Sequence, residues 1–193
     1  MSILKTKDYL VDVARRLFAQ YGKTHVTMND IANVSKKGRR TLYTHFKSKN
    51  DVYFAVIKSE LAILMKKLET VANKDILPDE KLLEYIFTRQ MAVRDAIARN
   101  GSLDADFFRD IYEVQRARRR IDVAEHKIIQ KILDDGVEQH IFDIKDTKML
   151  SLIILNSLKG MEAPLMRKKL SDYLDGKKED IINTIFYGIK KKA

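Results

Sequence analysis

Helix-breaking residues are scarce in this chain of 193 residues, and that restricts its fold more than any other feature. Only two prolines occur, Pro78 and Pro164, and no segment alternates strictly between apolar and polar residues as a half-buried strand does. Apolar residues instead recur at spacings of three and four, which is typical of amphipathic helices. The sequence therefore predicts an all-α fold of about nine helices.

The first part of the chain predicts two helices with recognisable ends. Residues 5–21 repeat apolar side chains on one face and stop before Gly22, a residue that commonly ends helices. Thr27 precedes a short apolar segment at residues 28–34, and Asp30 follows three positions later. Thr27 and Asp30 resemble a capping box, with Asp in place of the usual Glu or Gln.

A third short helix is predicted at residues 39–45, after a tight turn at residues 35–38. Two short helices joined by such a turn have the dimensions of a helix-turn-helix motif. Five residues can pack against the first helix, namely Ile31, Ala32, Leu42, Tyr43 and Phe46, which leaves polar side chains pointing outward. The residues predicted to face DNA bases are Arg39, Arg40, Thr41 and Thr44.

Positive charge is concentrated in the same region. Residues 1–50 hold eleven Lys or Arg against three Asp, a net charge of +8, whereas the other 143 residues hold 26 basic and 24 acidic side chains and contribute only +2. Such asymmetry indicates an anionic partner, either nucleic acid or a membrane surface.

Three segments, "LFAQYG", "VTMNDIA" and "TLYTHFKSK", resemble the DNA-binding domain of the TetR family of bacterial transcriptional regulators. The resemblance covers about a third of the chain. The residues that match the family pattern are Phe18, Gly22, Thr27, Ile31, Ala32, Thr41, Leu42, Tyr43, His45, Phe46 and Lys49. The turn departs from the pattern, because Arg40 stands where the family usually has a second Gly, and Lys36 is expected to need a positive φ.

The resemblance implies a second set of DNA contacts, this time to phosphates. It assigns them to Thr27, Lys37, Tyr43, His45 and Lys49. Lys49 also lies at a predicted helix N-terminus, where backbone N–H groups suit a phosphate. Two alternatives stay open: Tyr43 could serve the core alone, and His45 could act only in packing or capping.

The expected organisation has three parts. Residues 1–50 form a three-helix DNA-binding domain with its motif at about 27–46, residues 51–73 form a connecting helix, and residues 74–193 form a helical effector-binding and dimerisation domain. Five helices are expected in this last part. The first runs from Pro78 to Asn100, the second begins after a cap at Ser102, and the third ends at about His140. The fourth begins after a cap at Asp146 and is broken by Pro164, and the fifth covers about residues 179–191.

Two further sites are predicted in residues 74–193. A pocket for a small, largely apolar effector would use adaptable Met and aromatic side chains with polar anchors. Two alternatives stay open: the polar residues form the solvent-facing edge of an apolar stripe, and the apolar residues simply fill a core. Its candidates are Gln90, Met91, Arg94, Phe107, Tyr112 and Met161. An isologous four-helix dimer interface would use Leu150, Ile153, Ile154, Ser157, Leu158, Met161, Ile182, Ile185, Phe186 and Ile189.

Catalytic chemistry finds no support in the sequence. Cysteine is absent, which excludes thiolate zinc sites and disulfides, and no nucleophile elbow, phosphate-binding loop or metalloprotease motif occurs. His126 and His140 stand alone and are interpreted as structural, so no metal and no cofactor are predicted. The arginines at 116 and 118–120 are interpreted as a solvated face balanced by Glu113, Asp122 and Glu125.

The function predicted is therefore sequence-specific DNA binding rather than catalysis. The family default is a ligand-responsive repressor that acts as a homodimer on a palindromic operator. No apolar run is long enough to span a bilayer, and residues 1–8 lack the apolar run of a signal peptide. The cytoplasm is therefore expected, without a membrane partner. The alternative is a helical protein that binds anionic surfaces non-specifically and has no effector.

Overall fold

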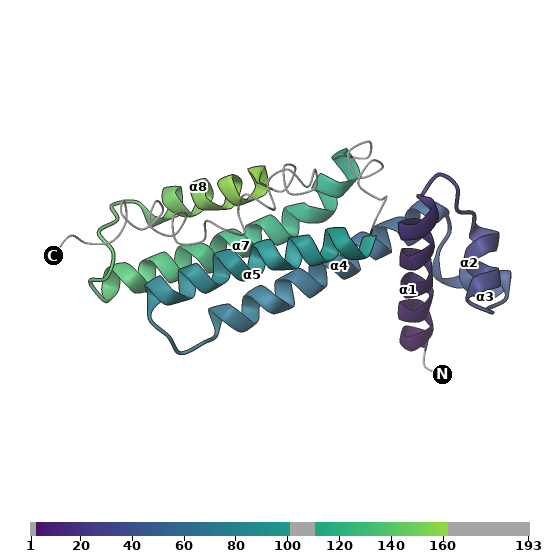
Figure 1. The fold of residues 1–193 in the computed structure, drawn as a ribbon, viewed down its shortest axis with the longest axis horizontal. Helices are drawn as coiled ribbons and strands as arrows, with labels where there is room; N and C mark the ends of the chain where they lie inside the picture. The colour runs from purple at the N-terminus through teal and green to yellow at the C-terminus, as the bar shows by residue number, and fades with distance from the viewer. Residues whose placement is uncertain (1–2, 101–110, 162–193) are drawn as a thin grey trace. The chain divides into compact units, whose positions relative to one another are not determined.

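Seven helices make up the described part of the chain. The computed structural model describes residues 3–100 and 111–161, and every regular element in these ranges is an α-helix, as predicted (Figure 1). The helices are α1 (Ile3–Tyr21), α2 (Met28–Val34), α3 (Arg39–His45), α4 (Lys49–Ala72), α5 (Pro78–Asn100), α7 (Ile111–Glu138) and α8 (Thr147–Gly160).

The ends of α1 and α2 follow the predicted local chemistry. Gly22 adopts a φ of 79°, in the left-handed region that ends α1. Thr27 forms a complete capping box with Asp30: the Thr27 Oγ1 accepts from the Asp30 N–H at 3.2 Å, and the Thr27 N–H donates to the Asp30 carboxylate at 2.8 Å. Lys36 has a φ of 52°, so the positive φ expected in the turn is confirmed.

Later helices begin at side chains that satisfy their first backbone N–H groups. Ser48 and Asp51 form a second capping box, which sequence reasoning did not anticipate, with the Ser48 N–H donating to Asp51 at 2.9 Å. Pro78 opens α5, where its missing N–H leaves no donor unpaired. The predicted cap at Asp146 is confirmed, since its carboxylate accepts from the Met149 N–H at 2.8 Å.

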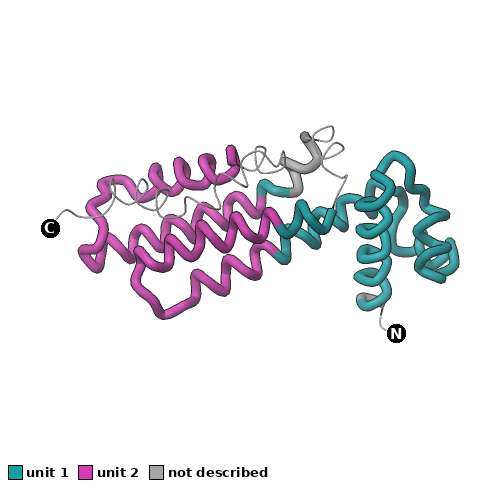
Figure 2. Tube along the Cα trace, viewed as in Figure 1, with its two compact units in different colours: residues 1–63, 95–119 teal, residues 64–94, 120–193 magenta. Residues whose placement is uncertain are grey.

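Contacts divide the chain into two compact units (Figure 2). Unit 1 comprises residues 1–63 and 95–119, and unit 2 comprises residues 64–94 and 120–193. The core of unit 1 joins α1, α2, α3 and the start of α4. Its buried residues are Leu10, Val11, Val13, Ala14, Leu17, Phe18, Val26, Ile31, Ala32, Leu42, Phe46, Val52, Tyr53, Val56 and Ile57.

The core of unit 2 contains a buried ion pair. Arg89 on α5 is 1% exposed, Glu125 on α7 is 0% exposed, and the Arg89 Nε donates to the Glu125 Oε2 at 2.5 Å. The Tyr85 hydroxyl donates to the same oxygen at 3.4 Å. The interpretation of Glu125 as part of a solvated face is therefore wrong, because the face of α7 that carries it turns toward α5 and not toward water.

In unit 2, the chain that follows α7 packs closely against Gly136, near the end of that helix. The backbone N–H groups of Ile141 and Phe142 both donate to the Gly136 carbonyl, at 2.9 and 3.0 Å. A Cβ on Gly136 would lie 2.2 Å from the Phe142 ring, so only glycine fits there. His140 takes a φ of 57° just after the helix end.

Several predicted features lie outside the described residues. They are the cap at Ser102, the break at Pro164, the helix at about 179–191 with Ile182, Ile185, Phe186 and Ile189, and the pocket candidate Phe107, together with the side chain of Tyr112. The total of about nine helices accordingly stays a prediction. No helix within the described ranges is long and apolar enough to cross a membrane.

Candidate DNA-binding surface

Helix α3 has one face in the core of unit 1 and one face in solvent. Leu42 is fully buried and Phe46, which follows the helix as its C-cap, is 4% exposed. These two side chains hold α3 against α1, α2 and α4. The opposite face therefore projects from a packed base, which is the arrangement that a major-groove reading helix requires.

The predicted base-facing residues lie on or beside that outer face. Arg39, Arg40 and Thr44 are exposed, and Thr41 is half-buried. The Thr44 hydroxyl donates to the Arg40 carbonyl at 2.9 Å, one helical turn back. Thr44 thus has its oxygen lone pairs and its methyl group available for a base edge, and within residues 3–100 and 111–161 the two arginines use none of their donors.

Thr27 has no donor left for a phosphate in this structure. Its hydroxyl donates to Asp30 at 2.7 Å and its backbone N–H donates to the same carboxylate oxygen at 2.8 Å. The hydrogen bond from the Thr27 side chain, then that from its backbone, hold the pKa of Asp30 below its ordinary value, and the nearby Lys49 charge adds to the effect. Thr27 and Asp30 fix the start of α2.

Lys49 is also bound to the protein. Its Nζ donates to the Lys23 carbonyl at 2.8 Å and to the Thr24 carbonyl at 3.2 Å, so the first residue of α4 holds the turn that follows α1. An ammonium group has three donors, which leaves one N–H for a phosphate. The predicted phosphate contact stays a prediction, and a structural role of Lys49 stands beside it.

The other predicted phosphate contacts differ in exposure. Tyr43 is 45% exposed, so it is not a buried core residue, and packing against the first helix does not account for all of its side chain. Lys37 and His45 are half-buried. The His45 ring centroid lies 6.3 Å from that of Phe46, which places the imidazole at the end of α3 and beside the core.

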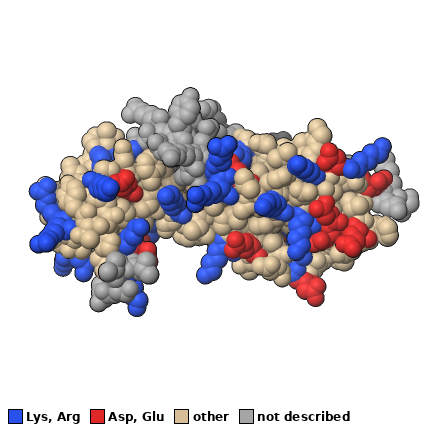
Figure 3. Space-filling model, turned by 180° about the vertical axis from the view of Figure 1, so that it is seen from behind, with Lys and Arg blue, Asp and Glu red and all other residues tan. Residues whose placement is uncertain are grey.

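Sequence reasoning missed two lysines that contact aromatic rings of the core. The Lys23 Nζ lies 4.1 Å from the centroid of the buried Tyr53 ring, and the Lys7 Nζ lies 5.8 Å from that of Phe46, both within cation–π range. Nothing in the spacing along the chain signals these pairs. In the left-hand part of Figure 3, where α1–α3 lie, Lys and Arg side chains crowd the surface with few acidic ones among them.

The pocket candidates in unit 2 are not gathered on one buried face. Met91 is 48% exposed, whereas Gln90, Arg94 and Met161 are half-buried. The buried face of α5 instead consists of Leu82, Tyr85, Ile86, Arg89 and Ala92 with Pro78. Arg89, which the sequence did not single out, occupies the position expected of an apolar core residue; its helical spacing from Leu82 and Ile86 was the available signal.

The interface candidates on α8 fall on two faces. Ile154 and Leu158 are buried in the core of unit 2, whereas Ile153 and Ser157 are exposed and Leu150 and Met161 are half-buried. Exposed Met149 and Leu152 extend the outer face. Within the described ranges, no three His, Asp or Glu side chains are grouped so that they could hold a metal ion.

Comparison with known proteins gives the same assignment for the amino-terminal region. The family model described as bacterial regulatory proteins of the tetR family matches residues 10–56, which contain α2, α3 and most of α1. The HTH-type transcriptional regulator QacR of Staphylococcus aureus is 24% identical over 170 residues, covering 82% of this chain and 85% of that protein.

Two further matches extend the comparison. An HTH-type regulator of Mycobacterium tuberculosis, MT1294, is 33% identical over 88 residues, which are 46% of this chain and 44% of that one. A crystal structure of a transcriptional regulator from Cytophaga hutchinsonii superposes with a TM-score of 0.78 at 23% identity, over 95% of this chain and 98% of that one.

The geometry and the comparisons agree on the fold and on the class of protein. Helices α1–α3 form a helix-turn-helix domain in which α3 presents an exposed, basic face. Further helices follow this domain, as in the structure from Cytophaga hutchinsonii. The family model describes bacterial regulatory proteins, and the relatives are HTH-type regulators of transcription. Residues 10–56 of this chain form a DNA-binding helix-turn-helix domain of the kind found in the TetR family of bacterial transcriptional regulators, and most of the chain is similar to an HTH-type regulator.

Proposed function

We propose that the protein is a repressor that binds a palindromic operator as a homodimer, with α3 of each subunit in the major groove. The observation that carries the proposal is the exposure of Arg39 and Arg40 at the start of a helix whose other face is fixed in the core. Arginine donates two hydrogen bonds to guanine O6 and N7, and each good pair contributes about 1–3 kcal/mol of discrimination.

Roles are proposed residue by residue on the same surface. Arg39, Arg40, Thr41 and Thr44 would read bases, whereas Lys37, Tyr43, His45 and one donor of Lys49 would hold phosphates. Because the Thr27 donors are bonded to Asp30, Thr27 would act by fixing α2 and not by contacting a phosphate through its hydroxyl.

The test compares variants on two duplexes, the one that the protein selects from a random pool and a scrambled one of equal length. Arg39→Ala or Arg40→Ala is expected to weaken binding to the selected duplex by about 1–3 kcal/mol, with much less loss on the scrambled one. Tyr43→Phe should weaken both slightly and equally, because it removes one phosphate donor. Equal losses of both arginine variants on the two duplexes would make them phosphate contacts instead.

The homodimer is supported by the outer face of α8. Met149, Leu152 and Ile153 are 61%, 42% and 52% exposed and recur at helical spacing with exposed Ser157. An apolar stripe with small residues suits an isologous helix-to-helix contact. A Leu152→Glu, Ile153→Glu double variant is expected to shift the mass in light scattering from dimer to monomer; a monomeric wild type at micromolar concentration would exclude the interface.

Release by a small, largely apolar effector bound in residues 74–193 is the second part of the proposal. Two buried polar atoms of unit 2, the Glu125 Oε1 and the Gln90 Nε2, have no hydrogen-bond partner in the part of the chain that is described, and a ligand could supply one. The effector must bind the DNA-incompetent state more tightly, since equal affinity shifts nothing. A screen for compounds that release the selected duplex tests this, and a Glu125→Gln variant with an unchanged response would place the site elsewhere.

A further inference from the structure

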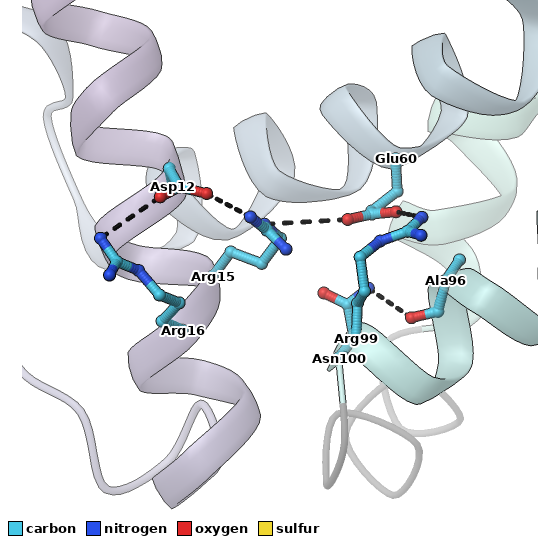
Figure 4. A network of polar contacts seen from close by, with 7 residues as sticks. All are labelled: Asp12, Arg15, Arg16, Glu60, Ala96, Arg99 and Asn100. Carbon is cyan, nitrogen blue, oxygen red and sulfur yellow. Dashed lines mark hydrogen bonds and ion pairs between the residues drawn. The ribbon is translucent and has the colours of Figure 1, made fainter.

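A chain of ion pairs joins three helices of unit 1 (Figure 4). Asp12 on α1 pairs with Arg16 at 3.3 Å and, more closely, with Arg15. Glu60 on α4 lies 3.8 Å from the Arg15 Nε and accepts a hydrogen bond of 2.7 Å from the Arg99 guanidinium on α5. Glu60 therefore lies between two arginines that belong to different helices.

The position of Glu60 makes these contacts stronger than ordinary surface pairs. Its side chain is 11% exposed, against 24% for Arg15 and 35% for Arg99. A carboxylate so shielded from water depends on its partners for stabilisation, because solvent supplies little of it. Its Oε1 has no hydrogen bond within the described ranges, so the Arg15 charge at 3.8 Å is its main compensation.

The ion pairs span a place where apolar packing is incomplete. A groove of about 680 Å³ lies along α1 and α4, and Arg15 and Arg99 both line it. Where side chains do not fill the space between helices, charged contacts set their spacing and angle. Arg15, Glu60 and Arg99 therefore determine how the middle of α1 is held against this part of α4 and the end of α5.

The orientation of α1 determines that of the reading helix. Leu10, Val13 and Phe18 of α1 share one close-packed core with Ile31 of α2 and Leu42 of α3. The start of α4, up to Ile57, belongs to the same core. Since such cores move as a body rather than deforming continuously, a shift of this body against the turn of α4 that carries Glu60 and against the end of α5 carries α3 with it. A contact of Glu60 can thereby act on DNA without touching it.

We propose that Glu60 is a positioning residue for DNA binding: by pairing with Arg15 and Arg99 it holds α1, and with it α3, in the orientation that fits the operator. The inference rests on the proposed operator binding. It extends that proposal to Glu60, a carboxylate that contacts no base. If only charge attraction mattered, removing this negative charge would not be expected to weaken DNA binding.

The sign of the effect separates positioning from charge. Glu60→Gln preserves shape but raises the net charge from its value of +10 by one unit. By counterion release and long-range attraction alone, that change should tighten DNA binding slightly. If Glu60 positions α1, binding weakens instead. The new amide would face the Arg15 guanidinium, Arg15 would keep only Asp12 on its own helix, and Arg99 would lose the carboxylate that it is bonded to.

The matched control is the ion pair between Lys159 and Asp122 in unit 2. Its N–O distance is 2.6 Å and its side chains are 32% and 26% exposed, comparable with those of Arg99 and Arg15. Asp122→Asn changes the net charge by the same unit and also breaks an ion pair. It is expected to bind the duplex that the wild-type protein selects as tightly as the wild type, or slightly more tightly.

The experiment titrates each full-length variant against that selected duplex by fluorescence anisotropy. Glu60→Gln is expected to bind about five- to tenfold more weakly, and Arg99→Gln to lose a similar factor. The double variant should be no weaker than Glu60→Gln alone, because Arg99→Gln removes only the Glu60–Arg99 contact, which Glu60→Gln has already removed. Equal or tighter binding by Glu60→Gln, or additive losses in the double variant, would overturn the proposal.

A measurement without DNA keeps the inference apart from the proposed function. Amide hydrogen exchange of α1 peptides should be faster in Glu60→Gln than in the wild type, and unchanged in Asp122→Asn. If the wild-type protein selected no duplex, the proposed operator binding would be refuted, and hydrogen exchange would still test whether Glu60 holds α1. If exchange in α1 were unchanged in Glu60→Gln, positioning by Glu60 would be refuted whatever DNA the protein binds.

Discussion

Replacing Lys49 by methionine tests whether this lysine stabilises the folded protein or serves only to contact DNA. Lys49→Met keeps the aliphatic stem and removes the ammonium that donates to the Lys23 and Thr24 carbonyls at 2.8 and 3.2 Å. Hydrogen bonds from charged donors contribute about 1.5–3 kcal/mol when buried. Because Lys49 is half-buried and water can replace part of each bond, we expect a loss of about 1–2 kcal/mol for both together.

That loss corresponds to a fall in Tm of about 2–8 °C for a protein of this size, measured by thermal unfolding without DNA. Lys47→Met is the control: Lys47 is exposed, carries the same charge and has no hydrogen-bond or ion-pair partner in residues 3–100 and 111–161, so a change within about 0.5 kcal/mol is expected. Equal stability of the two variants would refute the structural role. If Lys49 also holds a phosphate, its variant lowers the salt slope by about 0.9 per subunit.

Three other changes probe the helix ends and the core of unit 2 by urea unfolding. Gly136→Ala should cost about 1–3 kcal/mol, because its Cβ would lie 2.2 Å from a buried ring, whereas Gly160→Ala, with open space around it, should be neutral or stabilising. Glu125→Leu should cost about 3–5 kcal/mol by stranding a buried charge, and adding Arg89→Met should recover most of it; a double variant as unstable as the single one would contradict this. Asp30→Asn should destabilise the protein at neutral pH. Since the pKa of Asp30 is depressed, its contribution exists above the ordinary carboxyl pKa and should vanish as pH falls through the depressed value.

Helix ends could be predicted because their chemistry is local. The Thr27–Asp30 box, the stop at Gly22 and the cap at Asp146 each involve residues within three or four positions of one another, and the structure has all of them. The positive φ of Lys36 could be predicted for the same reason, because the conformation of a short turn depends on its own residues and not on distant contacts.

Contacts between distant segments could not be predicted from the sequence. Arg89 and Glu125 are 36 positions apart, and their pairing depends on which faces of α5 and α7 meet. In sequence terms Glu125 is one charge among many near an arginine cluster, so a solvated face was the natural interpretation. The bonds of Lys49 to residues 26 and 25 positions earlier are equally invisible to spacing rules.

The structure also divides the basic residues that the sequence counts together. Of the charges that make residues 1–50 so positive, Arg15 is paired with carboxylates, Lys49 with backbone carbonyls and Lys23 with an aromatic ring. Arg39 and Arg40 are exposed on α3. A net charge of +8 therefore overstates what the domain can offer to phosphates, because part of that charge holds the helices in place. The same side-chain types serve attraction and positioning, and only the fold determines which residue does which.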